Sequence, residues 1–323
     1  MIPISARWLS YGLPFRRPWE AGGRRIDGRR GQLLRLDAAD GRIGWGDCAP
    51  LPEAGIDEAS AMRYAEECAA LDLEAQAAGT PLASFLAGSP AASEIPVNAI
   101  LGAVTAATPE DIVAACKEGY SVLKFKVGCT LPATEIRILQ HLAEALPAGC
   151  RLRLDANGAW DEITAVEFLA ACERLPVESL EEPLRDPDPA ALDRLQEGTR
   201  IALALDESLA RLPVPELLAR SPVRRLVLKP ARHGGMRATL ALARQARDAG
   251  ITCVVTSALE SACGLLAAAH LAAAVAAGSD REVAHGLATA GWFATDTGTP
   301  PPVAGGRLRL PDRPGLGFVP VLS

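Results

Sequence analysis

The sequence predicts an α/β protein in which a barrel of alternating strands and helices, of the (β/α)₈ type, follows a smaller α+β unit. The first observation is length, because 323 residues suffice for two domains or for one large barrel with an appendage. The second is a regular alternation: from residue 95 onward, short β-type runs recur about 23–31 residues apart, with helical stretches between them. The third is composition, since 49% apolar and 22% charged residues are typical of a globular chain.

The first part of the chain has a different pattern from the rest. Residues 31–47 predict a β-hairpin, because two apolar-rich runs flank a polar turn at Asp40 and Gly41. Residues 57–75 have helical spacing and begin at Asp57. Strands followed by a helix predict a small α+β domain. The Gly- and Arg-rich segment 14–30 is expected to be either a mobile lid, whose arginines meet substrate carboxylates, or a plain flexible loop.

The remaining repeats predict eight strands and seven helices, since a strand, a helix and two loops need about this many residues. The strands are expected at 97–101, 121–127, 151–155, 178–181, 201–206, 224–229, 252–256 and 283–286. The helices are expected at 109–119, 131–146, 160–174, 187–197, 208–220, 235–249 and 261–277. The alternative is an open doubly wound sheet, but no G-x-G-x-x-G follows a strand. The Pro- and Gly-rich tail, 300–323, is expected to return to the N-terminal domain.

Charge and composition narrow the expected partners and location. A net charge of −6 and 4% aromatic residues disfavour a nucleic-acid partner. No apolar run reaches the roughly 18 residues of a membrane span, and no signal pattern opens the chain, so a cytoplasmic protein is expected. The eight cysteines are scattered, and we interpret them as small buried apolar residues. The sequence leaves the oligomeric state open.

Polar side chains fall at the same position of successive repeats, the carboxyl end of each strand. In a barrel these ends form one rim, where active sites are built. A single such residue is usually a solvated loop residue, whereas several at one phase predict a site. They are Lys124 and Lys126, Asp155 and Asn157, Glu181, Asp206, Lys229, and Thr256 with Ser257.

Three of these residues are carboxylates on neighbouring strands, Asp155, Glu181 and Asp206. Packed together without a cation they would repel one another. All-oxygen ligation suits Mg²⁺, with Mn²⁺ as the alternative, so the sequence predicts a metal site. Glu181 is chosen over Glu182 because it directly follows an apolar strand residue.

Two lysines, Lys126 and Lys229, lie half a barrel apart and are expected to face each other across the mouth, with Lys124 also pointing inward. Desolvation, neighbouring lysines and a divalent cation are expected to lower the pKa of a lysine base. A lysine opposite a metal-bound carboxylate suits removal of a proton α to that carboxylate.

These residues resemble the muconate-lactonizing subgroup of the enolase superfamily, in which a Lys or His base and Mg²⁺ are the known pairing. The matching motifs, in chain order, are LKFKVG, LRLDANGAW, LEEPL, ALDESL and LVLKP. The resemblance implies an enolase-type (β/α)₇β TIM-like barrel at 95–299. It also implies an α+β capping domain at 1–94, completed by 300–323.

A finer resemblance points to the o-succinylbenzoate synthase family, through GWGDCAPLP at 44–52, TSALESACGL at 256–265 and HGLAT at 285–289. It implies Mg²⁺-dependent syn dehydration of a small dicarboxylate, 2-succinyl-6-hydroxy-2,4-cyclohexadiene-1-carboxylate. The product, 2-succinylbenzoate, feeds menaquinone or phylloquinone synthesis. The resemblance makes Lys126 the base and Lys229 the stabilising cation. Substrate-binding roles fall to Lys124, Asn157, Ser257 and Gly286.

Related activities remain as alternatives, because they use the same lysine pair. They are N-acylamino acid racemase, dipeptide epimerase and muconate cycloisomerase, with a catalytically inactive scaffold as the non-enzymatic alternative. The epimerases of the subgroup typically carry Asp-x-Asp near strand eight, whereas this chain has only Asp296 between two threonines. His233 is interpreted as a loop residue and His285 as a structural rim residue. Arg153 is expected inside the barrel beside an unidentified carboxylate.

Overall fold

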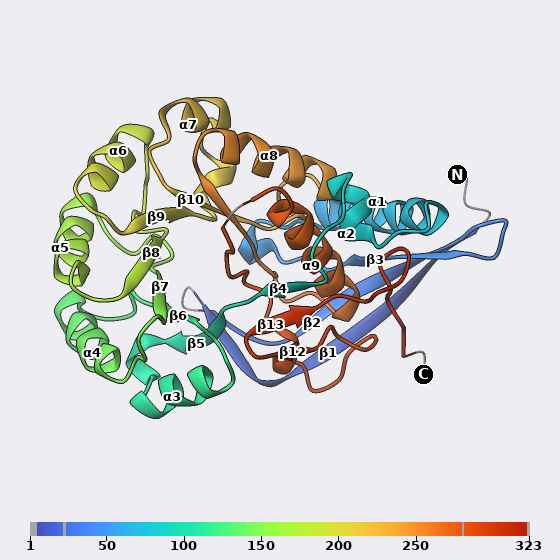
Figure 1. Ribbon diagram of the computed structural model, residues 1–323. Helices are drawn as coiled ribbons and strands as arrows, with labels where there is room; N and C mark the ends of the chain where they lie inside the picture. Colours follow the sequence, from blue (N-terminus) through green and yellow to red (C-terminus); the bar gives the residue numbers. More distant parts are fainter. Residues whose placement is uncertain (1–4, 22–23, 280, 322–323) are drawn as a thin grey trace.

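A three-stranded antiparallel sheet opens the fold of the computed structural model, which describes residues 5–21, 24–279 and 281–321 (Figure 1). Its strands are β1 (Ser5–Ala21), β2 (Arg24–Asp37) and β3 (Ile43–Cys48), in that spatial order. The predicted hairpin at 31–47 is confirmed as β2 and β3. The expectation of a loop at 14–30 is wrong for the described part, because Leu13 pairs with Arg29 and Trp19 with Ile26.

The helix predicted at 57–75 is α1 (Glu58–Ala77), and it packs on β3. It begins after Asp57 because that side chain accepts a 2.7 Å hydrogen bond from the Ser60 amide. The strand comes close to the helix at Gly46, where a Cβ atom would collide with the Ala65 carbonyl. The short elements η1 (Pro52–Ala54) and α2 (Leu82–Ala87) flank α1.

A seven-stranded parallel sheet follows, with its strands in chain order and curled within an outer arc of helices (Figure 1). The strands are β5 (Ala99–Ala103), β6 (Val122–Lys126), β7 (Arg151–Asp155), β8 (Val177–Glu181), β9 (Ala202–Leu205), β10 (Arg225–Leu228) and β11 (Thr252–Val255). The helices are α3 (Pro109–Lys117), α4 (Pro132–Glu144), α5 (Glu162–Cys172), α6 (Pro189–Glu197), α7 (Val214–Arg220), α8 (Met236–Asp248) and α9 (Ala262–Ala276). The 3₁₀ turns are η2 (Val104–Ala106), η3 (Ser208–Ala210) and η4 (Ala290–Trp292).

Two predicted elements differ from the structure. The helix expected at 208–220 is divided into η3 and α7, because proline lacks the amide that a helix interior needs. α7 therefore begins with Pro213 at its N-cap and Pro215 in its first turn. The strand expected at 283–286 is only a pair of isolated parallel bridges, Val97 with His285 and Thr256 with Gly286. Val97 lies two residues before β5, and Thr256 directly follows β11. The segment with His285 and Gly286 therefore bridges the two ends of the parallel sheet.

The most apolar stretch of the chain forms α9, which lies between the parallel sheet and the N-terminal sheet (Figure 1). Every residue from Ala262 to Ala274 is buried, and α9 contacts α2, α8, β3 and β11. A helix that is apolar on all sides is buried on all sides. Alanine dominates it because small side chains let neighbouring elements approach closely.

The chain end pairs with earlier segments. Strands β12 (Val303–Ala304) and β13 (Arg307–Arg309) form a small antiparallel sheet with β4 (Glu94–Pro96). The Leu82 amide donates to the Gly315 carbonyl at 2.8 Å, and the Leu316 amide donates to Asp72 Oδ1 at 2.7 Å. The tail therefore contacts α1 and α2.

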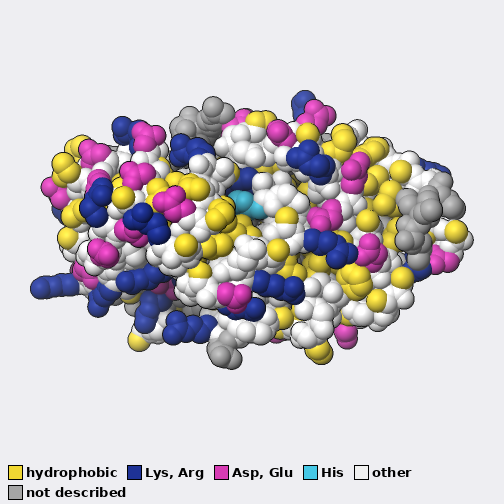
Figure 2. All heavy atoms as spheres, turned by 90° about the horizontal axis from the view of Figure 1, so that it is seen from above, with side chains coloured by type: hydrophobic (Ala, Val, Ile, Leu, Met, Phe, Trp, Pro, Cys, Tyr) yellow, Lys and Arg dark blue, Asp and Glu magenta, His cyan; other side chains and the backbone are white. Residues whose placement is uncertain are grey.

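The cysteines are only partly as expected. Cys48, Cys68, Cys172, Cys253 and Cys263 are buried, whereas Cys116 and Cys150 are half-buried and Cys129 is exposed. Among the described residues, no helix is both long and apolar enough to cross a membrane. Figure 2 shows positive, negative and apolar side chains interspersed over one face of the molecule.

Candidate active site

One cavity of about 670 Å³ collects every residue of the predicted site. Parallel pairing sets Lys126, Asp155 and Glu181 in register, so these three side chains leave their strands at one level. Asp206 and Lys229 each follow the last residue of a strand, β9 and β10. The carboxyl ends of neighbouring parallel strands meet at one rim, which brings these predicted residues together. The lining residues also include Lys124, Asn157, Ser257 and Gly286.

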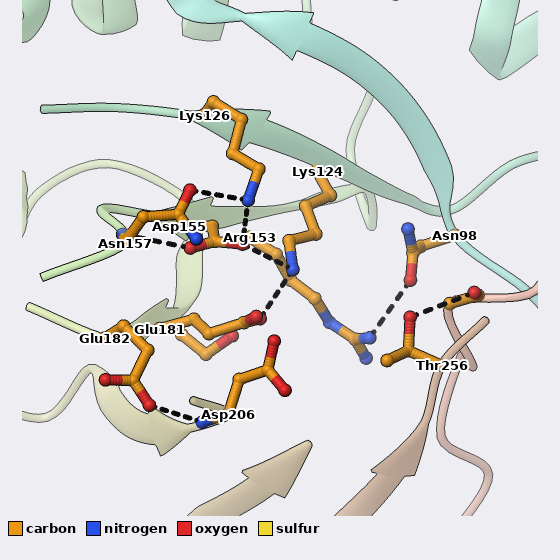
Figure 3. A network of polar contacts seen from close by, with 12 residues as sticks. Asn98, Lys124, Lys126, Arg153, Asp155, Asn157, Glu181, Glu182, Asp206 and Thr256 are labelled. Carbon is orange, nitrogen blue, oxygen red and sulfur yellow. Dashed lines mark hydrogen bonds and ion pairs between the residues drawn. The ribbon is translucent and has the colours of Figure 1, made fainter. Parts of the chain in front are cut away.

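Lysines and carboxylates pair directly within this cavity (Figure 3). Lys126 Nζ lies 2.6 Å from Asp155 Oδ2 and 2.7 Å from Asn157 Oδ1. Lys124 Nζ lies between two carboxylates, 2.9 Å from Asp155 Oδ2 and 2.6 Å from Glu181 Oε2. Both carboxylates are buried, so each ion pair is formed away from bulk water.

The charges in this cluster shift one another's pKa values. Burial alone lowers the pKa of Lys124, but Asp155 and Glu181 outweigh burial and raise it well above its ordinary value. Burial likewise raises the pKa of Asp155, but Lys124 and Lys126 reverse this and hold it well below its usual range. Burial and the Asp155 charge raise the pKa of Glu181 to about 7.

The two adjacent glutamates have different surroundings. Glu181 points into the cavity, and its Oε1 is buried without a hydrogen-bond partner. Glu182 turns away at a positive φ of 47°. Its Oε1 accepts from the Asp206 amide at 2.6 Å and from the Ser208 amide and hydroxyl at 3.0 and 2.8 Å. Glu182 therefore holds the backbone that carries Asp206, whereas Glu181 presents a free oxygen to the cavity.

Asp206 is surrounded by cations, one of which sequence reasoning missed. It accepts from Lys229 Nζ at one oxygen and from Arg232 Nη1, 2.6 Å away, at the other. These two charges hold the pKa of Asp206 well below its usual range despite its burial. Arg232 also donates from Nε to the Ala54 carbonyl at 2.6 Å, which ties the segment before α1 to the rim. Nothing in the sequence near Lys229 distinguishes Arg232 from the other arginines.

A further carboxylate, Glu207, was also missed although it lies in the ALDESL motif. It lines the cavity, and its Oε2 is buried without a hydrogen-bond partner. Burial and the Asp206 charge raise the pKa of Glu207 to about 7. Asn157, held at a positive φ of 46°, donates to Glu207 Oε1 at 3.4 Å.

The segment after β11 lines the cavity, but the hydroxyl of Ser257 already has hydrogen-bond partners within this segment. Ser257 Oγ donates to Glu260 Oε2 at 2.6 Å and accepts from the Leu259 amide at 2.9 Å. Gly286 lies beside it, where a Cβ atom would collide with Thr256 Oγ1, so only glycine fits. Backbone and small side chains therefore form this side of the cavity.

Arg153, the arginine expected inside the barrel, has the carboxylate of Glu178 as its partner. Arg153 Nε donates to Glu178 Oε1 at 2.6 Å, and Arg225 Nη1 shares that oxygen at 3.0 Å. His285 is buried, and its Nδ1 accepts from the Val255 amide at 3.0 Å, which is the expected structural role. His233 is half-buried, and burial lowers its pKa to about 4.

Lysine itself is a signal that sequence reasoning could have used. The chain has 33 Lys and Arg residues, of which only four are lysines, and three of these line the cavity. The fourth, Lys117, is exposed at the end of α3. Arginine cannot be deprotonated in a protein, whereas a lysine pKa can be tuned. In a chain that otherwise uses arginine, three of the four lysines therefore mark the cavity.

The donor set suits a hard divalent cation. Among the described residues, no three His, Cys, Asp or Glu side chains stand close enough together to hold a metal ion as they are. Lys124 occupies the space between Asp155 and Glu181 (Figure 3). The free, buried Glu181 Oε1 and the all-carboxylate composition nevertheless fit Mg²⁺, provided that Lys124 moves aside.

Comparisons with known proteins agree with this geometry. Residues 108–321 match the family described as Enolase C-terminal domain-like. The o-succinylbenzoate synthase of Thermobifida fusca (strain YX) is 33% identical over 284 residues, covering 86% of this chain and 80% of that protein. The substrate-liganded L-Ala-D/L-Glu epimerase from Bacillus subtilis has a TM-score of 0.86 at 24% identity, over 99% of each chain. The dipeptide epimerase from Cytophaga hutchinsonii, complexed with Mg and D-Ala-L-Val, has a TM-score of 0.86 at 24% identity, over 99% of this chain and 96% of that one.

A curled parallel sheet with charged residues at its strand ends, together with these matches, defines an enzyme of the enolase superfamily. The chain belongs to the o-succinylbenzoate synthase family, and it is a lyase. Because one fold supports several activities, the structural neighbours do not by themselves select the substrate.

Proposed function

We propose that this protein is an o-succinylbenzoate synthase that dehydrates 2-succinyl-6-hydroxy-2,4-cyclohexadiene-1-carboxylate to 2-succinylbenzoate. The observation that carries the proposal is the pairing of Lys126 with Asp155 and of Lys229 with Asp206 in one cavity. The Thermobifida fusca relative supports this choice of substrate. The product is expected to enter menaquinone or phylloquinone synthesis, and we propose a cytoplasmic location.

Lys126 in its neutral form removes the proton α to the substrate carboxylate. Its ammonium then protonates the hydroxyl that leaves from the same face as water, so substrate becomes product plus one water. Lys229 remains cationic and stabilises the negative charge that develops. Mg²⁺, or Mn²⁺, bound by Asp155, Glu181 and Asp206, would supply positive charge beside the substrate carboxylate. Lys124 and Asn157 would orient the carboxylate end.

Ser257 and Gly286 are proposed to bind the succinyl end. The Ser257 hydroxyl bonds within its own loop, so we propose that this loop contributes backbone groups and shape rather than a free hydroxyl. Trp19, Ile26 and Leu51 also line the cavity, and their apolar side chains suit the substrate ring.

We also propose the domain division that this function requires. Residues 95–299 form the (β/α)₇β barrel, which the bridges at His285 and Gly286 would close, and 1–94 with 300–323 form the capping domain. Pairing of β13 with β4 and the contacts of Leu316 with Asp72 support the return of the tail.

Racemase or epimerase activity is the second candidate, because structural neighbours of similar fold act on dipeptides or N-succinyl amino acids. The position of Asp296 disfavours a dipeptide substrate. Its Oδ1 accepts from the Ala262 and Thr297 amides, both at 2.7 Å, and it does not line the cavity. Asp296 therefore does not supply the carboxylate that a dipeptide ammonium group would need at this position.

The test is turnover of the cyclohexadiene substrate with Mg²⁺ and with EDTA, beside N-succinyl amino acids and L-Ala-L-Glu. Rapid metal-dependent formation of succinylbenzoate is expected. Lys126→Ala should abolish α-proton exchange, and Lys229→Ala should lose turnover, each by about 10³-fold or more. Lys117→Ala is the matched control. Racemisation without dehydration, or full activity of Lys126→Ala, would contradict the proposal.

A further inference from the structure

Arg29 is a buried arginine whose guanidinium donates hydrogen bonds to three backbone carbonyls. It lies on β2 with 5% of its surface exposed. Nε donates to the Leu259 carbonyl at 3.0 Å, Nη1 to the Pro50 carbonyl at 2.8 Å and Nη2 to the Ala49 carbonyl at 2.8 Å. Burying a guanidinium is costly, so three well-formed charge-assisted hydrogen bonds at one site indicate a specific task.

The carbonyls that Arg29 contacts lie in two segments of the active-site cavity: Leu259 lines it, and Ala49 and Pro50 directly precede lining residues. The segment after β3 contributes Leu51, Pro52, Glu53 and Ala54 to the lining, and the segment after β11 contributes Ser257, Ala258 and Leu259. The strand that carries Arg29 contributes a third wall through Ile26. One side chain therefore joins three segments that are far apart in the sequence.

The wall after β11 is in a backbone conformation that needs support. Leu259 has a positive φ of 59°, which is unfavourable for a branched residue. Its amide donates to Ser257 Oγ at 2.9 Å, and its carbonyl accepts from Arg29. Its side chain packs against Leu13, the β1 partner of Arg29, and against Phe293. Arg29 thus supplies the hydrogen bond on the carbonyl side of a strained residue.

We propose that Arg29 is a positioning residue that fixes the two cavity walls at 49–54 and 257–259 relative to the β1–β2 hairpin. This inference rests on the proposed function, because the cavity is taken to be the substrate site. Arg29 does not line the cavity, and it acts through the carbonyls that it holds. A lysine cannot replace it, since one ammonium cannot reach three carbonyls in the fork geometry of a guanidinium.

The chain offers a matched control in the next residue. Arg30 is on the same strand, but its side chain points to the opposite face and is exposed. We would compare Arg29→Met and Arg29→Lys with Arg30→Met and Arg30→Lys. The measurements are kcat and KM for the cyclohexadiene substrate with Mg²⁺, amide hydrogen exchange by mass spectrometry, and thermal melting.

Arg29→Met is expected to raise KM by about tenfold or more, with a smaller change in kcat. Amide exchange should accelerate together in 49–54 and 257–261, and not in α5. Arg29→Lys should show a weaker form of both effects, and millimolar methylguanidine should partly restore KM in Arg29→Ala. The Arg30 variants should match the wild type.

Equal KM and equal exchange in folded Arg29 and Arg30 variants would overturn the proposal. If Arg29→Met does not melt cooperatively, folded Arg29→Lys decides by the same two criteria. A wild-type protein without turnover of the substrate would instead overturn the proposed function. The exchange comparison would then still decide whether Arg29 holds both walls.

Discussion

His270, in the buried helix α9, is predicted to make the protein sensitive to acid. Its side chain is fully buried. Nδ1 accepts from the Ala83 amide at 3.1 Å, and Nε2 lies 3.0 Å from the Leu316 carbonyl. Only a neutral imidazole with its hydrogen on Nε2 satisfies both contacts. Protonation would place a second hydrogen against the Ala83 amide.

The magnitude follows from the pKa of His270, which burial lowers from 6.5 to about 4. Between these values the unfolded chain binds a proton that the folded chain does not. The free energy of unfolding contributed by this group is therefore fully present above pH 6.5. It falls by at most about 1.4 kcal/mol per pH unit as the pH decreases, which amounts to about 2 kcal/mol from pH 6.5 to 4.5.

Other buried groups also make the free energy of unfolding depend on pH. The effect of His270 must therefore be measured as the difference between a His270 variant and the wild type at each pH. Burial lowers the pKa of His285 to about 3, so this residue, like His270, makes the folded protein less stable as the pH falls. Asp47 acts in the opposite direction, because burial raises its pKa to about 6 and the folded state then holds the extra proton. Its contribution falls as the pH rises from about 4 to 6.

The assay is urea unfolding of the wild type, His270→Asn and His141→Asn at pH 6.5, 5.5 and 4.5. His270→Asn should be less stable at pH 6.5, because the Leu316 carbonyl loses its donor. Its stability should then fall less steeply, so that its deficit against the wild type shrinks by about 2 kcal/mol by pH 4.5. His141 is exposed, and its variant should follow the wild-type curve. Parallel curves for His270→Asn and the wild type would refute a neutral, buried His270.

Two further predictions concern the carboxylates. Mg²⁺ should raise the melting temperature of the wild type, by the equivalent of about 2.7 kcal/mol at 100 times its Kd, but not that of Asp206→Asn; an equal rise in both would contradict the proposed metal site. Glu182→Gln should cost about 1–3 kcal/mol in chemical unfolding, because Glu182 accepts three buried hydrogen bonds. Glu181→Gln should instead abolish the Mg²⁺ response while unfolding normally, and the reverse assignment of these two effects would show that Glu182 is the ligand.

Much of the site could be predicted because local pattern and strand direction suffice for it. Each charged residue directly ends a β-type run, and parallel strands bring these ends to one rim. Alternation along β6 correctly places both Lys124 and Lys126 toward the cavity. The choice between Glu181 and Glu182 is harder, because it depends on a turn with positive φ that no residue type marks.

The local sequence pattern does not correctly predict two other segments, residues 14–30 and 283–286. Residues 14–30 look like a loop because Pro14, Pro18 and several glycines interrupt them. Most of this segment is nevertheless strand, because β2 pairs with β1 on one side and β3 on the other. The prediction of an eighth strand at 283–286 has the opposite outcome. The composition of this segment suits a strand, but it forms two isolated bridges instead.

The sequence by itself determined the order of strands and helices, the charges at the strand ends and the family to which they belong. These properties depend on residue type and short-range spacing, which the chain carries locally. Only the tertiary structure decided that Lys124 lies between Asp155 and Glu181, that Arg232 reaches Asp206, and that Arg29 donates to carbonyls after β3 and after β11. Such contacts join segments up to 230 residues apart, as Arg29 and Leu259 do. Their geometry depends on how whole elements pack, which short-range spacing does not encode.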